Sequence, residues 1–69
     1  MEKTIEHWNF TGDDDRHYEV ELVQEYVSDR RGGWIEGMRR VELADGRHLQ
    51  RIDDNTYRII RNGVTIRRS

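Results

Sequence analysis

The last hairpin of the chain is encoded by residues 56–68, TYRIIRNGVTIRR, in which Asn62-Gly63 separates two runs of alternating apolar and polar residues. Asn-Gly is the strongest short signal for a two-residue type I′ turn, in which both central residues take positive φ. This turn places Arg58 opposite Arg67, and two facing arginines need an acidic neighbour or an anionic ligand. The other face of the hairpin is apolar, with Ile59 opposite Ile66 and Tyr57 beside them.

Four further turn signals divide the rest of the chain into short runs rich in β-branched and aromatic residues. They are residues 11–15, 28–33, 45–46 and 53–55. The sequence therefore predicts an all-β fold, a small antiparallel meander or partly closed barrel of five to six short strands. The predicted strands are residues 3–10, 17–27, 34–44, 47–52, 56–61 and 64–68.

A second hairpin follows if residues 18–27 pair with residues 34–43, with Val27 opposite Trp34. Apolar residues then align on both faces, as if one face covered the core and the other met a partner. Leu22 falls opposite Arg39 in this register, and a β-bulge at Gly37 would repair the mismatch, since glycine inside a strand often marks a bulge.

The turn at Asp45-Gly46 is predicted to be one residue longer than a two-residue turn, which sets Leu43 opposite Leu49. The alternation of the strands then predicts a core on one face of the sheet. The predicted core residues are Tyr18, Val20, Leu22, Val41, Leu43, Leu49, Ile52, Tyr57, Ile59 and Ile66.

A helix over residues 14–27 is the alternative, and it would change the fold class to α+β. Its apolar residues also recur at helical spacing, and the acidic residues 13–15 would suit a helix N-terminus. Three valines and the Tyr-Glu-Val-Glu-Leu alternation of residues 18–22 favour a strand.

Length and composition predict a single small domain over residues 1–69. A chain of 69 residues with 33% hydrophobic and 38% charged residues can build only a thin core. Without cysteine it has neither disulfides nor thiolate metal sites. Residues 1–10 contain no apolar run of the signal-peptide or membrane-spanning kind. We therefore expect a cytoplasmic protein that does not bind a membrane.

The charges are segregated along the chain. Residues 1–29 carry nine acidic residues against Lys3 and Arg16, whereas residues 30–69 carry ten arginines against five acidic residues. Acidic and basic strands that neutralise each other across a sheet would explain this pattern, and so would a recognition surface.

Residues for catalysis are scarce. The three histidines lie in separate segments, and the only serines are Ser28 and Ser69. The acidic residues 13–15 lack the alternation and turn glycine of a calcium loop. No phosphate-binding loop or dinucleotide fingerprint is present. The sequence predicts a protein that is not an enzyme and holds no metal or cofactor.

Two binding hypotheses remain. The first is a protein-interaction module or small regulatory protein that binds a larger protein or itself, as a homodimer, through its surplus of aromatic, methionine and arginine residues. The second is nucleic-acid binding through the arginine-rich C-terminal half, with an aromatic ring stacking on a base. The candidate binding residues are Trp34, Met38, Arg39, Arg40, Tyr57, Arg58, Arg61, Arg67 and Arg68.

Overall fold

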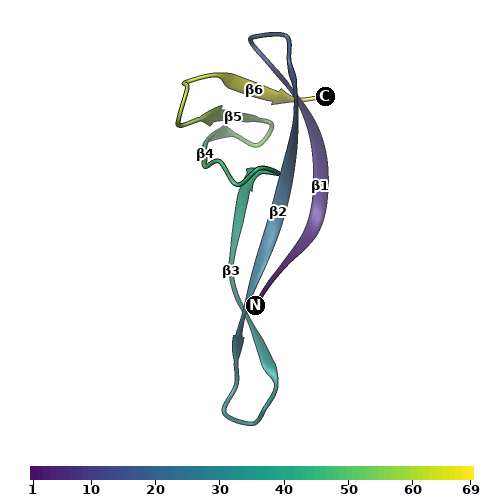
Figure 1. Ribbon diagram of the computed structural model, residues 1–69, viewed down its shortest axis with the longest axis vertical. Coiled ribbons are helices and arrows are strands. Elements are labelled where there is room, and N and C mark those ends of the chain that lie inside the picture. The colour runs from purple at the N-terminus through teal and green to yellow at the C-terminus, as the bar shows by residue number, and fades with distance from the viewer.

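Six antiparallel strands and no helix make up the structure, a computed structural model that describes residues 1–69 (Figure 1). The predicted all-β class is confirmed, and the helical alternative for residues 14–27 is wrong because most of that segment forms a strand. The strands are β1 (Glu2–Gly12), β2 (His17–Ser28), β3 (Trp34–Leu43), β4 (Leu49–Asp53), β5 (Thr56–Ile59) and β6 (Thr65–Arg68).

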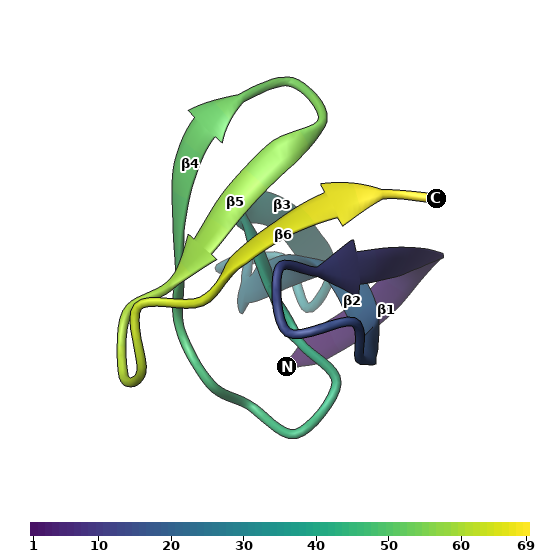
Figure 2. The same ribbon diagram turned by 90° about the horizontal axis from the view of Figure 1, so that it is seen from above.

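The strands form one sheet in the order β3-β2-β1-β6-β5-β4. Two three-stranded meanders are thus joined by the pairing of β1 with β6. The sheet curls so that its two end strands, β3 and β4, approach each other (Figure 2), and a single bridge joins Glu42 of β3 to His48, the residue before β4. The result is a half-barrel rather than a closed barrel.

The two meanders differ greatly in length. At about 3.3 Å per residue, the 12-residue β2 spans about 40 Å and the four-residue β6 about 13 Å. The molecule is correspondingly elongated, with extents of 48 × 20 × 18 Å, and β4, β5 and β6 cover only one end of β1, β2 and β3 (Figure 1). We call the uncovered part of these long strands, residues 1–5 and 23–40, the projecting ribbon.

The core lies between the two meanders, at the barrel end of the long strands. Phe10 is at its centre with only 1% of its surface exposed, and its ring meets that of Tyr57 edge to face at a centroid distance of 5.8 Å. The other buried core residues are Val20, Leu43, Ile59 and Ile66. Trp8, Tyr18, Val41, Leu49, Tyr57 and Val64 pack against them.

Two predicted core residues do not belong to this core. Ile52 is exposed because the even-numbered and odd-numbered residues of β4 face opposite sides and Leu49 already occupies the core side. Leu22 points to the same side as Val20 but is only half-buried, and it lies outside the core cluster, next to the projecting ribbon.

The hairpin of β5 and β6 does not contain the predicted type I′ turn. Gly63 has φ +73°, but Asn62 does not have a positive φ; instead its Oδ1 accepts a hydrogen bond from Val64 N at 3.0 Å. The wider loop places Arg58 opposite Thr65 rather than Arg67. Because this register differs from the predicted one by two residues, each side chain keeps its face, and the apolar face of the hairpin is retained.

The register of β2 and β3 also differs from the prediction, since Val27 faces Ile35 instead of Trp34. The predicted bulge at Gly37 is confirmed: the register shifts between Gln24 and Tyr26, where β3 has one additional residue. Beyond the bulge Leu22 faces Val41, so the expected mismatch with arginine does not occur.

The predicted pairing of Leu43 with Leu49 is wrong. Leu43 N donates to Arg47 O at 3.1 Å, and Gly46, at φ +90°, donates back to Leu43 O at 2.8 Å. These two hydrogen bonds close the turn so that Leu43 lies opposite Arg47 and Glu42 opposite His48. After His48 the chain leaves β3 and pairs with β5 instead.

Candidate interaction surface

The nine predicted binding residues lie in two separate places. Four are on β3, mostly in the projecting ribbon, and five belong to the barrel. The ribbon group is Trp34, Met38, Arg39 and Arg40. The barrel group is Tyr57, Arg58, Arg61, Arg67 and Arg68.

The barrel group does not form an uninterrupted row of unpaired arginines around an exposed aromatic ring. Tyr57 packs its ring against Phe10 in the core. Arg67 forms an ion pair with Asp13 at 3.0 Å, and the guanidinium of Arg68 lies over the Trp8 ring at 5.1 Å. In this group Arg58 and Arg61 make no ion pair, and they lie on a strand and in a loop respectively.

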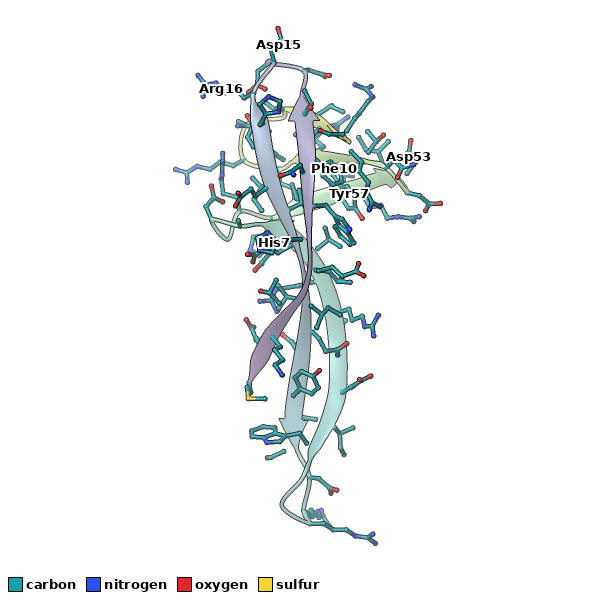
Figure 3. All side chains as sticks on the ribbon, turned by 90° about the vertical axis from the view of Figure 1, so that its right-hand side faces the viewer. His7, Phe10, Asp15, Arg16, Asp53 and Tyr57 are labelled. Carbon is teal, nitrogen blue, oxygen red and sulfur yellow. The ribbon has the colours of Figure 1, made fainter.

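The far end of the projecting ribbon carries a concentration of exposed apolar side chains. Met38 is 76% exposed and Trp34 is 57% exposed. Val27 and Ile35 are directly paired across β2 and β3 and are both more than half exposed, whereas Trp34 pairs with Ser28 and so lies on the opposite face. Figure 3 shows the ribbon continuing beyond His7, away from Phe10 and Tyr57, so no second layer covers either face there.

One backbone edge of this ribbon is unpaired. β3 is the first strand of the sheet, and of its residues only Glu42 makes a bridge on the side away from β2. Within residues 34–41 the backbone N–H and C=O groups that point away from β2 therefore have no partner strand, and Gly37 O is taken by Gln24. An exposed strand edge of this kind is a template for a further strand.

The β3 bulge is fixed by a buried amide. Gln24 is 1% exposed, and its Nε2 donates to Glu25 O and Gly37 O, each at 3.0 Å. Its Oε1 accepts a hydrogen bond from Arg39 Nε at 2.6 Å. The side-chain amide thus donates hydrogen bonds to two backbone carbonyls where the regular β ladder is interrupted. It also holds Arg39, one of the candidate binding residues, in place.

The bulge decides which side chains share a face. Glu36 pairs with Tyr26 and Arg39 pairs with Gln24, and both partners point to the same side of β2. In a regular strand, residues three apart point to opposite sides. The additional residue in β3 therefore brings Glu36 and Arg39 to the same face. Neither forms an ion pair within the chain.

The opposite face of the ribbon is held by a cluster of charges around Arg40. Its Nη2 contacts Glu2 at 2.7 Å and its Nη1 contacts Glu25 at 3.1 Å. Its Nε donates to Glu42 at 3.1 Å. Hydrogen bonding to Arg40 lowers the pKa of the Glu2 carboxyl, and the hydrogen bonds from Arg40 to Glu2 and Glu42 raise the pKa of Arg40 above its usual value.

This cluster compensates an unfavourable pattern in the sheet. Glu2 is directly opposite Glu25, and Glu21 is directly opposite Glu42, and facing like charges destabilise a ladder. To reach Glu2 on β1 from β3, Arg40 must extend across β2, and Val23 of β2, which pairs with Arg40, is almost fully buried. Arg40 therefore joins the three long strands, and its charge is already balanced.

At the other end of the molecule, an open hollow of about 440 Å³ lies among the loops at the barrel end. Two pairs of its polar side chains bond to each other. Tyr18 donates to Asp14 at 2.5 Å, and Arg47 donates to Asp45 at 2.8 Å. No three or more histidine, aspartate or glutamate side chains are grouped in a way that could hold a metal ion.

Comparisons with protein-family models, curated proteins and solved structures find no match for this chain. No helix is long and apolar enough to cross a membrane.

Four residues of the ribbon are not among the predicted binding residues: the exposed Val27, Ile35 and Glu36, and the buried Gln24. A signal for Gln24 was present, since it continues the alternation of Tyr18, Val20 and Leu22 on one face of β2 with a polar residue. A polar residue at a core-facing position indicates a specific hydrogen-bonding role.

Proposed function

We propose that the chain is a non-enzymatic protein-interaction module that binds a protein partner through the projecting ribbon. The observation that carries this proposal is the free edge of β3 together with the exposed side chains of Val27, Trp34, Ile35 and Met38. A thin 69-residue fold would gain stability by burying these residues in its own core, yet they lie at the end farthest from it.

The charge of the ribbon supports a protein partner. Residues 1–5 and 23–40 carry four acidic residues against Lys3 and four arginines, so the ribbon is close to neutral. Interface centres are depleted in lysine and acidic residues and enriched in aromatic residues, methionine and arginine. A surface for nucleic acid would instead show an excess of positive charge.

Nucleic-acid binding through the barrel arginines is the competing function. The lack of ion pairs at Arg58 and Arg61 favours it, and the packing of Tyr57 in the core counts against base stacking there. Fluorescence anisotropy of labelled single-stranded RNA, single-stranded DNA and duplex DNA at about 50 and 200 mM salt separates the two functions, because phosphate contacts weaken steeply with salt. We expect no binding at either salt concentration.

The direct test of the proposal is site-specific photo-cross-linking in living cells. A photoreactive amino acid replaces Met38 at the ribbon or, as the control, Asp54, whose side chain is 86% exposed in the turn between β4 and β5. We expect a discrete protein adduct from position 38, weakened by Trp34→Ser, and none from position 54. Equal adducts from the two positions, or none from position 38, would refute the proposal.

A further inference from the structure

We infer that the partner of the projecting ribbon is a second copy of the chain, with the free edges of two β3 strands pairing antiparallel about a two-fold axis. This inference rests on the proposed function, because it names the protein that the ribbon binds. The axis lies between Gly37 and Met38, so that Glu36 of one copy faces Arg39 of the other.

The charges of β3 are self-complementary in this register. Glu36 makes no polar contact within the chain, and Arg39 uses only its Nε, toward Gln24, leaving both terminal nitrogens without a protein acceptor. Because the bulge places Glu36 and Arg39 on one face, the two-fold axis brings each next to its counterpart in the other copy. Two reciprocal ion pairs result, and a two-fold interface requires such reciprocity.

The same register is favourable for the apolar residues. Trp34 of one copy is placed opposite Val41 of the other, on the face that carries the ion pairs. Ile35 is placed opposite Arg40 on the other face, beside the first carbons of its side chain, because the rest of Arg40 extends across β2. Trp34 thereby gains an apolar cross-strand partner.

The bulge itself does not prevent this pairing. Gly37 O already accepts a hydrogen bond from Gln24, so the irregular position does not depend on a partner strand. The two regular flanks, residues 34–36 of one copy and residues 39–41 of the other, form the new ladder on both sides of the axis. Such a short pairing buries less than the roughly 800 Å² per partner of a standard interface, so we expect a dissociation constant in the micromolar range.

Analytical ultracentrifugation between about 1 and 500 μM tests the inference with a charge exchange. Glu36→Arg and Arg39→Glu each place like charges opposite each other in the dimer, and each should weaken dimerisation about tenfold or more. The double variant exchanges the two charges and should restore the dissociation constant of the wild-type dimer. Arg58→Glu, an exposed arginine without an ion pair on the barrel, is the matched control and should dimerise as the wild type does.

Arg39→Glu also removes the hydrogen bond to Gln24, so thermal unfolding of each variant accompanies the sedimentation measurement. Glu36→Arg removes no contact within the chain and keeps the test valid if Arg39→Glu unfolds. A chain that stays monomeric at all concentrations overturns the inference. So does a dimer that Glu36→Arg does not weaken.

The outcomes separate this inference from the function on which it rests. A monomer in the ultracentrifuge that still cross-links from position 38 to a different protein overturns only the second copy as partner. A monomer that gives no adduct from position 38 overturns both.

Discussion

Replacing Gln24 with leucine removes the amide that fixes the bulge of β3 while nearly preserving side-chain volume. The amide makes two hydrogen bonds to backbone carbonyls and accepts one from the charged Arg39, and it is 1% exposed. Neutral hydrogen bonds contribute about 1 kcal/mol each and those to charged groups about 1.5–3 kcal/mol, and buried groups left unpaired add a penalty. Because the backbone partners can recover some water contact at this ribbon, we expect a loss of about 2–4 kcal/mol in the free energy of unfolding.

The loss is large for this chain. At about 0.05–0.15 kcal/mol per residue, its whole free energy of unfolding is about 3–10 kcal/mol. Urea unfolding followed by tryptophan fluorescence measures the change. Gln50→Leu is the matched control, since Gln50 is exposed on β4 and makes no side-chain hydrogen bond, and it should change the free energy by less than about 0.5 kcal/mol. Equal effects of the two substitutions would refute the role assigned to Gln24.

Two further predictions concern the core and the barrel end. Phe10→Ala should cost about 3–5 kcal/mol and leave much of the chain unfolded at 25 °C by circular dichroism, whereas Trp34→Ala should cost less than about 1 kcal/mol; similar losses would contradict the placement of the core. The hydrogen bond to Asp14 raises the pKa of Tyr18 above its ordinary value of 10.0, so its stabilising contribution is complete below pH 10 and is lost as pH rises through the raised pKa. Asp14→Asn should lower that pKa in an NMR titration of the Tyr18 ring, and an unchanged midpoint would exclude this cause.

Several features of the fold could be predicted from the sequence because they depend on neighbouring residues. Turn residues such as Asp45-Gly46 divide the chain, and alternation along each run assigns side chains to faces, so the strands were located to within a few residues. The bulge at Gly37 was also predictable, since the regular register opposed Leu22 to Arg39.

Of the candidate surface, the sequence indicated Trp34, Met38 and Arg39 by residue type alone. It could not place them, because their exposure depends on where the short strands stop covering the long ones. Phe10 illustrates the same limit. It is absent from the predicted core, and only the pairing of β1 with β6, more than 50 residues apart, encloses it there.

Local chemistry thus determined the strands, the positions of the turns and the alternation of faces, because each depends on backbone preferences within a few residues. The tertiary structure alone decided the registers, the half-barrel and the projecting ribbon. A register shift of two residues leaves every side chain on the same face, so the alternation of apolar and polar residues cannot reveal it. The β5 and β6 hairpin shows such a shift. Glu36 and Arg39 share a face for a related reason: a single additional residue in β3, held by the buried amide of Gln24, reverses the alternation between them.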